Sequence, residues 1–328
     1  MKTKMSIRDL ALVQNTIVFA THEFFAREHM ITVPFPPTVG MVSCPKGAYG
    51  TDSQTVEIKF VKSKEKGQPT SEVYLCDSFQ FYLEYLCRLN RTGVYSINPS
   101  HRCDQRDNTH LNVFNHIEAE IIGTIQDEML LAEKLLRSLV SKVVEQHGDL
   151  ISRQAGSTKH LESFLDYGPL PRVSIDDAEK IVGKNGIKIN KRPFFREVTR
   201  EGELRLIKEF GGWVWLTPID HNGVSFFQAF HDDKTKAKSA DLLMGLGEMI
   251  GSGQRHSNAE DLIEAIHIHG LQPDFYNWYI KLRSADLITT SGFGMGMERF
   301  LAWVFNSKDI RDFELFPRDY NKSLAFVP

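Results

Sequence analysis

Glycines at the three alternate positions 292, 294 and 296 mark the segment Ser291–Phe300, which reads Ser-Gly-Phe-Gly-Met-Gly-Met-Glu-Arg-Phe. Because glycine has no side chain, alternate glycines let the backbone approach a ligand closely. The apolar residues of Leu301–Phe305 then predict a helix directly after the glycines. Arg299, at the start of that helix, would face an anionic phosphate. Glycine spacing alone does not establish a phosphate site, since Gly-x-Gly occurs in many turns.

The order of the other predicted elements favours an α+β fold. Helix-like periodicity covers residues 6–30, 126–146, 259–269 and 275–283, and β-type runs cover 55–61, 71–76, 94–97, 113–122, 213–216 and 224–230. Because the strands are not each followed by a helix, an antiparallel β-sheet flanked by helices is favoured over a doubly wound parallel sheet. The same order argues against a Rossmann dinucleotide site at Gly292.

Length and composition are those of an ordinary globular protein. The chain has 328 residues, of which 41% are hydrophobic and 25% charged, and we expect residues 1–328 to form one large domain. The formal net charge of −3 excludes a general basic surplus and leaves room for a local basic patch. The four cysteines lack zinc-site spacing, so we expect reduced thiols. Without a signal peptide or a long apolar run, we expect a cytoplasmic protein that does not contact a membrane.

Several segments together resemble the catalytic core of class II aminoacyl-tRNA synthetases. The resemblance is to the aspartyl/asparaginyl subgroup, is closest to asparaginyl-tRNA synthetases, and covers residues 8–318. It implies a class II catalytic fold and the ATP-dependent adenylation of an amino-acid carboxylate. The matching segments are motif 2 (Asn98–Phe114), the acidic and glycine-rich strand pair (Asp241–Arg255), the stretch before motif 3 (Tyr276–Arg283), motif 3 (Gly292–Phe300) and the C-terminal stretch Ile310–Arg318.

The resemblance implies an ATP site with two catalytic arginines, Arg102 and Arg299. The planar guanidinium of Arg102 suits the α-phosphate and the reacting carboxylate oxygen, where negative charge builds up in the transition state. His110 matches a residue that meets the triphosphate, and Phe114 matches the aromatic ring on which adenine stacks. The full set implied for ATP is Arg102, Asp104, His110, Phe114, Asp241, Glu248, Gly296 and Arg299.

The resemblance also implies a magnesium site and an amino-acid site. Asp241 and Glu248 match a carboxylate pair that holds Mg²⁺ against the phosphates, and hard oxygens suit that hard cation. Arg255 matches the residue that reads the substrate's side-chain oxygen. The full set implied for the amino acid is Lys46, Ser78, Gln80, Arg255 and Gly292, with Ser78 and Gln80 near the α-amino end.

Three departures from the family bear on the substrate and the acceptor. The chain starts almost directly at the motif 1 helix, so we expect no anticodon-binding domain. Lys46 aligns with a glutamate that helps to hold the α-ammonium group, and a lysine there would repel a free ammonium; a shift of one residue, with Lys46 pointing outward, remains open. Leu83 replaces the lysine with which aspartyl enzymes bind a side-chain carboxylate, which favours an amide or another neutral side chain.

These departures favour a ligase that adenylates an Asp/Asn-like amino acid and transfers it to a small non-tRNA amine, as in the archaeal asparagine synthetase-related paralogues. tRNA is a possible but less favoured acceptor, and the alternatives are an asparaginyl-tRNA synthetase core and a non-catalytic nucleotide-binding paralogue. The family also implies a homodimer formed through motif 1. The apolar residues available for that seam, which could equally cap the core, are Phe24, Phe25, Val33, Pro34 and Phe35.

Overall fold

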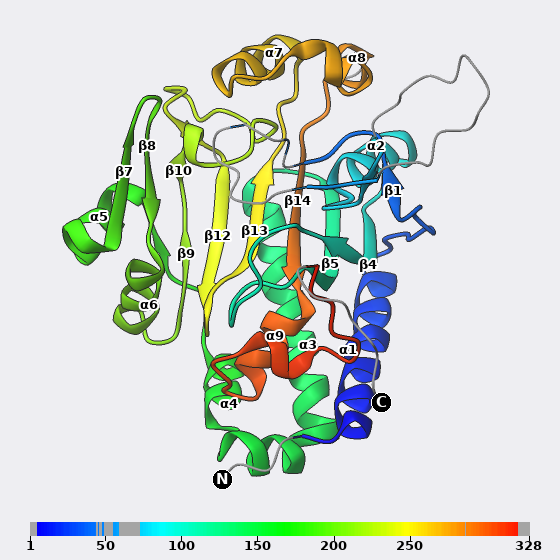
Figure 1. Ribbon diagram of the computed structural model, residues 1–328, viewed down its shortest axis with the longest axis vertical. Coiled ribbons are helices and arrows are strands. Elements are labelled where there is room, and N and C mark those ends of the chain that lie inside the picture. Colours follow the sequence, from blue (N-terminus) through cyan, green and yellow to red (C-terminus); the bar gives the residue numbers. More distant parts are fainter. Residues whose placement is uncertain are drawn as a thin grey trace.

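A seven-stranded sheet forms the centre of the molecule, with strand order β4-β5-β14-β13-β12-β9-β6 (Figure 1). The computed structural model describes residues 5–43, 45, 48, 55–58, 73–285 and 287–320. The strands are β4 (Val94–His101), β5 (Val113–Ile122), β14 (Thr290–Gly296), β13 (Gly247–Gln254), β12 (Ser239–Met244), β9 (Trp213–Leu216) and β6 (Arg172–Val173). All neighbouring pairs in this sheet are antiparallel except β6 and β9. The α+β expectation is therefore confirmed.

Helices cover both faces of this sheet. The long helix α3 packs on one face together with α1 and α9, and their apolar side chains form the largest buried cluster. Helix α2 lies on the other face, where Glu84 accepts a hydrogen bond from Thr290 of β14. The helices are α1 (Ile7–Arg27), α2 (Gln80–Asn90), α3 (Ile125–Ala155), α4 (Lys159–Asp166), α5 (Ile175–Gly186), α6 (Arg200–Glu209), α7 (Ala259–Ile268), α8 (Asn277–Ala285) and α9 (Met297–Val304).

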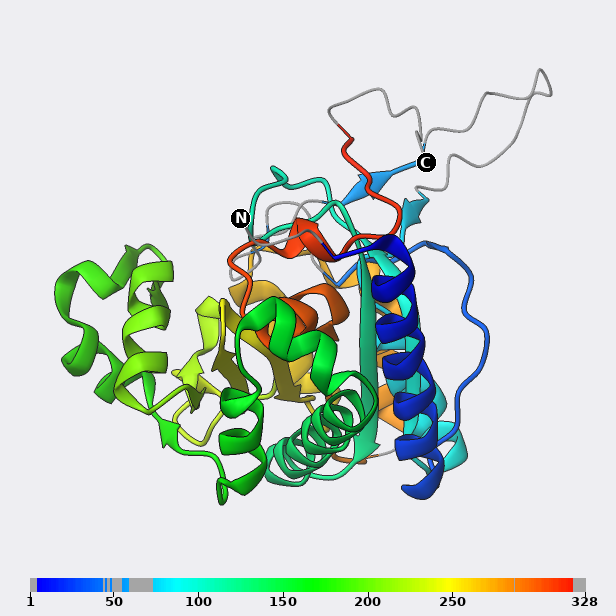
Figure 2. The same ribbon diagram turned by 90° about the horizontal axis from the view of Figure 1, so that it is seen from below.

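Smaller elements surround the central sheet. The hairpin β7/β8 and helices α5 and α6 form a module at the sheet edge far from α1 (Figure 2). The remaining strands are β1 (Thr38–Val39), β2 (Val56–Glu57), β3 (Tyr74–Leu75), β7 (Ile187–Lys191), β8 (Phe194–Val198), β10 (Ile219–Asp220) and β11 (Lys236–Ala237), and the 3₁₀ helices are η1 (His221–Gly223), η2 (Pro273–Tyr276) and η3 (Ile310–Phe313).

The two central strands β5 and β14 carry different chemistry on their two faces. Successive side chains of a strand point to opposite faces. On β5, Ile117 and Ala119 are buried in the α3 core, whereas Glu118 and Glu120 alternate with them and face the other way. On β14, Phe293 and Met295 join the same core, so the alternate glycines face the carboxylates. The sequence alternation thus builds one apolar face and one polar face.

The pairing register places glycines where the polar side chains of β5 need space. Gly294 pairs with Glu118, Gly292 with Glu120 and Gly296 with His116. A Cβ at Gly294 would lie 2.3 Å from Nε2 of His116, and one at Gly292 would lie 1.9 Å from Oε2 of Glu120. Both distances are far below van der Waals contact, so these glycines are required by the protein's own side chains.

Two sequence expectations changed in the structure. Residues 224–230, predicted as a strand, form only isolated bridges at Gln228 and Phe230, because the adjacent Phe226 and Phe227 are both buried in one aromatic cluster and the backbone must turn. Phe24 and Phe25 are buried in the chain's own core, with Phe25 stacked on Tyr95, so they cap the core and do not offer a seam to a second copy. The predicted site residue Lys46 and the expected loop at 62–69 lie outside the described residues.

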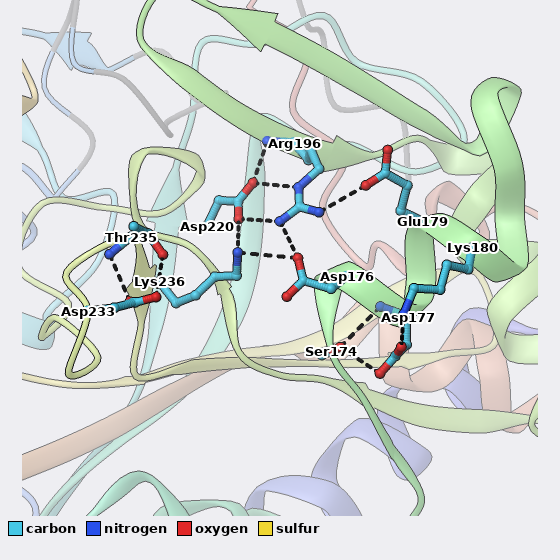
Figure 3. A network of polar contacts seen from close by, with 10 residues as sticks. All are labelled: Ser174, Asp176, Asp177, Glu179, Lys180, Arg196, Asp220, Asp233, Thr235 and Lys236. Atoms are coloured by element: carbon cyan, nitrogen blue, oxygen red, sulfur yellow. Dashed lines mark hydrogen bonds and ion pairs between the residues drawn. The ribbon is translucent and has the colours of Figure 1, made fainter.

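An ionic cluster centred on the buried pair Arg196 and Asp220 joins the edge module to the two-stranded sheet of β10 and β11 (Figure 3). Arg196 of β8 donates from Nε and Nη2 to the two carboxylate oxygens of Asp220 at 2.8 Å, and it also contacts Asp176 and Glu179 of α5. Lys236 of β11 lies 2.8 Å from the same Asp220 carboxylate. Arg196 is 8% exposed and Asp220 is 3% exposed, so each needs the other's charge. This cluster closes the base of the loop between β10 and β11.

We predict that Arg196→Met lowers the free energy of unfolding by about 3–5 kcal/mol at neutral pH, because the buried Asp220 carboxylate loses its main partner. Hydrogen bonds from Arg196 and Lys236 hold the pKa of Asp220 below its usual value against the opposing effect of burial. Their stabilisation is present above about pH 4 and is lost as the carboxylate protonates in acid, so the deficit should shrink there. Urea titrations at several pH values measure this, with the exposed Arg153→Met as control; equal losses in both variants would contradict it.

We predict that Gly294→Ala and Gly296→Ala differ sharply in stability. A Cβ at Gly294 meets the buried His116 ring, whereas a Cβ at Gly296 has nothing closer than 3.8 Å. Displacing the ring should cost about 1–3 kcal/mol, while Gly296→Ala should stay within about 0.5 kcal/mol of the parent protein. Thermal unfolding of the two variants tests this, and equal melting temperatures would show that the His116 ring moves freely.

Candidate active site

A pocket opens on the polar face of the sheet, beside β5, β13 and β14. It contains most of the residues expected to bind ATP. Its lining residues are Arg102, Asp104, Thr109, His110, Leu111, Phe114, His116, Glu248, Met249, Gly294, Gly296, Glu298, Arg299 and Ile310. Seven of the eight expected ATP residues lie among them, and the eighth, Asp241, lies on the adjoining β12.

Arg102 and Phe114 form one wall of the pocket. The guanidinium carbon of Arg102 lies 5.2 Å from the centre of the Phe114 ring, within cation–π distance. Asn112 fixes the loop that carries Arg102, because its side-chain amide donates to the carbonyls of Arg102 and Asp104 at 3.0 and 2.8 Å. Nε of Arg102 is buried and has no hydrogen-bond partner among the described residues. An anionic ligand would satisfy that donor.

Arg299 connects three parts of the pocket. It lies in the first turn of α9. Its guanidinium donates to the carbonyl of Glu248 on β13 and, at 3.1 Å, to the carbonyl of Thr109 in the motif 2 loop. Burial lowers the pKa of Arg299, and the neighbouring guanidiniums of Arg102 and Arg200 lower it further, against Glu248 and Glu203. The neighbouring positive charges of Arg299, Arg102 and Arg200 favour the binding of a polyanion between them.

Asp241 and Glu248 converge above Gly251. Asp241 pairs with Gly251 across β12 and β13, and a Cβ at Gly251 would lie 2.7 Å from Oε1 of Glu248 and 3.8 Å from Oδ1 of Asp241. Burial raises the pKa of Asp241 well above its usual value, and Glu248 and Glu203 add to this. Two clustered carboxylates of this kind fit Mg²⁺, which usually takes one or two carboxylates together with substrate phosphates. In the described part of the chain, no group of three or more His, Cys, Asp and Glu side chains is arranged to hold a metal ion alone.

Arg255 lies at the other end of the polar face. Its Nε and Nη2 donate to the two oxygens of Glu120 at 3.0 and 2.8 Å, and both side chains are buried. Gly292 lies directly beside this pair, since a Cβ there would lie 2.8 Å from Nη2 of Arg255. The expected neighbours Arg255 and Gly292 are therefore brought together.

Ser78, Gln80 and Leu83 lie at the start of α2. The hydroxyl of Ser78 donates to Glu118 and accepts a hydrogen bond from the backbone N–H of Gln80 at 3.2 Å. Burial raises the pKa of Glu118 to about 7. Leu83 is fully buried among apolar side chains that include Cys76 and Phe79, so it packs in a core cluster away from the pocket lining.

Sequence reasoning missed three residues of β5 that point into the site. His116 lines the pocket, Glu118 binds Ser78 and Glu120 binds Arg255. Burial lowers the pKa of His116 to about 3, helped by Arg102 and Arg299, so the ring is neutral. The alternation His-Ile-Glu-Ala-Glu at 116–120 was the available signal, because polar residues at every second position of a predicted strand mark one face.

Two further contributions had no local signal in the sequence. Glu203 comes from α6, where a Cβ at Gly247 would lie 2.3 Å from its Oε2, and burial together with Glu248 raises its pKa to about 7. Glu84 of α2 accepts hydrogen bonds from Arg88, Arg283 and Thr290, all of them buried. The contacts of Glu203 with Gly247 and of Glu84 with Arg283 and Thr290 join segments far apart in the chain, so only the folded structure reveals them.

The comparisons with known proteins agree with this geometry. The family model described as tRNA synthetases class II (D, K and N) matches residues 2–320. An asparagine--tRNA ligase of Pyrococcus abyssi is 30% identical over 93% of this chain and 67% of its own length, and that of Thermococcus gammatolerans is 29% identical over 95% and 69%. The chain thus spans about two thirds of these relatives.

Solved structures give the same result. The asparaginyl-tRNA synthetase of Pyrococcus horikoshii complexed with asparaginyl-adenylate superimposes with a TM-score of 0.84 at 26% identity, covering 97% of this chain and 70% of that one. The Entamoeba histolytica enzyme in complex with asparaginyl-adenylate, at 24% identity and a TM-score of 0.78 over 95% and 67% of the two chains, shows the common fold.

These findings correct the interpretation favoured from the sequence. The favoured prediction was transfer of the amino acid to a small non-tRNA amine. It is wrong for both the function and the partner, because the relatives are named asparagine--tRNA ligases and the matching structure holds asparaginyl-adenylate. No helix in the described part of the chain has the length and apolar character to cross a membrane. The chain belongs to the class II aminoacyl-tRNA synthetases of the aspartate, lysine and asparagine subgroup and is an ATP-dependent, adenylate-forming ligase.

Proposed function

We propose that this chain activates L-asparagine as asparaginyl-adenylate and transfers it to tRNA, as the catalytic core of an asparaginyl-tRNA synthetase. The observation that carries the proposal is the Arg255–Glu120 pair beside Gly292. A carboxamide has one oxygen that accepts and one nitrogen that donates, so the guanidinium suits its oxygen and the carboxylate suits its N–H. An aspartate carboxylate would meet the like charge of Glu120.

The other end of the amino acid would lie near Glu118. Its carboxylate is buried on the same face of β5, two residues from Glu120, and Ser78 orients it. A bound α-ammonium group would hold that carboxylate in its charged form, against the burial that raises its pKa. Of the residues expected at the α-amino end, Ser78 would orient Glu118 for the ammonium group, and the backbone N–H of Gln80 would support Ser78.

ATP would occupy the pocket beside motif 3. Adenine would stack on Phe114, and the triphosphate would lie between Arg102, Arg299 and His110, all of which line the pocket. The asparagine carboxylate attacks the α-phosphorus in line, and pyrophosphate leaves. No protein nucleophile is required, because positioning and neutralisation of the developing charge lower the barrier. Arg102 is the residue placed to neutralise the attacked phosphate.

Mg²⁺ would be held by Asp241 and Glu248, and when bound it would neutralise charge on the phosphates. Burial, and then the nearby Glu248 and Glu203, raise the pKa of Asp241, and a bound cation would favour its ionised form. Gly296 would let the backbone approach the nucleotide, since a Cβ there would lie 3.8 Å from the ring of Phe114, on which adenine would stack.

We also propose that residues 1–328 act as one catalytic domain in the cytoplasm, where tRNA and ATP are present, and that the enzyme is a homodimer. Among the described residues of α1, Ile7, Leu12 and Phe19 are 68, 49 and 67% exposed, so this helix offers apolar side chains to a second copy. Light scattering tests the dimer, and a mass near 37.5 kDa would contradict it.

We predict that the purified enzyme supports ATP–pyrophosphate exchange with L-asparagine and at least about 100-fold less with L-aspartate, the discrimination expected when a buried polar pair mismatches its substrate. Charging of total tRNA with radiolabelled asparagine should follow. Exchange without any charging would remove tRNA as acceptor, and no exchange with asparagine would contradict the proposal as a whole.

We predict that Arg102→Lys lowers kcat of the exchange reaction about 100-fold or more, with a smaller change in KM for asparagine. Lysine keeps the charge but loses the planar pair of donors that fits a phosphate in the transition state. Arg311→Lys, an exposed arginine whose guanidinium binds only Asp309 among the described residues, is the matched control. Equal activity of the two variants would show that Arg102 does not touch the reacting phosphate.

A further inference from the structure

Gln228 brings an unused hydrogen-bond acceptor to the asparagine end of the site. Its backbone bridges to Arg255, so the two side chains point to the same face. A Cβ at Gly253 would lie only 2.0 Å from Oε1 of Gln228, so the amide lies directly on that glycine. This Oε1 is buried and has no hydrogen-bond partner among the residues that the structure describes.

The amide of Gln228 lies in line with the Arg255–Glu120 pair. In the sheet register, Ser239 pairs with Gly253, Gly253 with Gly292, and Gly292 with Glu120. Residues directly opposite one another point to the same face of a sheet. The hydroxyl of Ser239 is likewise buried without a partner in the described part of the chain. Across the sheet from Glu120, this row of residues therefore carries two more buried polar atoms, Oε1 of Gln228 and Oγ of Ser239. Neither has a hydrogen-bond partner among the described residues.

The fold holds the backbone of Gln228 in place. The backbone carbonyl of Gln228 lies 3.0 Å from Nε2 of His221, and the ring of the preceding Phe227 lies 5.2 Å from the guanidinium carbon of Arg255. The loop is closed at its base by Asp220 and Lys236, the partners of Arg196. The backbone that carries the Gln228 side chain is thus positioned before any ligand binds, which lowers the entropic cost of using that side chain.

We propose that Gln228 is a specificity-determining residue that accepts a hydrogen bond from the side-chain amide of L-asparagine. This inference rests on the proposed function. A carboxamide nitrogen carries two N–H groups; Glu120 accepts one, and Oε1 of Gln228 accepts the other. Aspartate would place a carboxylate oxygen against Oε1 of Gln228. Both oxygens are acceptors, so no hydrogen bond could form between them. Gln228 therefore adds to the selection of amide over carboxylate.

The test is Gln228→Met, which keeps the approximate size of the side chain and removes the acceptor. Pyrophosphate exchange is measured with asparagine and with aspartate, and KM for ATP is measured alongside. We expect the KM for asparagine to rise about tenfold and the preference for asparagine over aspartate to fall by at least the same factor, the value of one hydrogen bond. The KM for ATP should stay within about twofold, since the pocket described above does not include Gln228.

The matched control is Gln126→Met, the same change at an exposed position of α3, which should leave every parameter unchanged. If Gln228→Met does not fold, Gln228→Asn makes the same test, because its shorter side chain withdraws the acceptor. An unchanged asparagine preference in a folded variant overturns the inference while leaving the proposed function intact. Loss of activity with aspartate alone in Gln228→Met would also overturn it, since that result would mean that the Gln228 amide donates its N–H to the substrate. If the parent enzyme does not use asparagine, both fail together.

Discussion

The pairing register between β5 and β14 is the constraint on which the site depends. It sets the polar residues of β5 opposite the glycines of β14. Because side chains alternate between faces, a shift of one residue would turn Glu118 and Glu120 into the α3 core and bring Ile117 and Ala119 to the site. The core residues Phe293 and Met295 prevent that shift, since they would have to leave the core. Apolar packing on one face therefore determines the chemistry of the other.

The polar face holds several acidic and basic side chains whose ionised forms are disfavoured by burial. Burial raises the pKa of Glu118, Glu203 and Asp241 together, and it lowers that of Arg299. Each shift shows that the ionised form is costly before substrates arrive. ATP, a divalent cation and an α-ammonium group would supply the opposite charges. Binding them would therefore offset the unfavourable free energy of burying these groups in their ionised form. Such strained groups gather at functional sites because the same arrangement stabilises the transition state.

The sequence predicted the fold well wherever the chemistry is local. Periodicity placed α1, β5 and β9 close to their observed bounds and found the start of α3, which continues nine residues beyond the predicted end. The prediction failed at residues 224–230, where the β-type run forms only isolated bridges. Glu203, Glu84 and Gln228 could not be predicted, because each acts through a partner more than twenty residues away in the chain. Glu118 and Glu120 could have been, from their alternation with Ile117 and Ala119.

Choice of amino acid and choice of acceptor depend on different parts of the molecule. In the proposed function, the amino acid would be read by buried groups on the sheet face, where Arg255, Glu120 and Gln228 could satisfy each hydrogen-bonding atom of a carboxamide. The acceptor would react only with the finished adenylate, so the groups proposed to read the side chain carry no information about it. Leu83 illustrates the distinction: as a buried core residue away from the pocket lining, it carries no information about the substrate side chain or the acceptor. The groups proposed to read the amino acid therefore point to asparagine, but they do not distinguish tRNA from another acceptor.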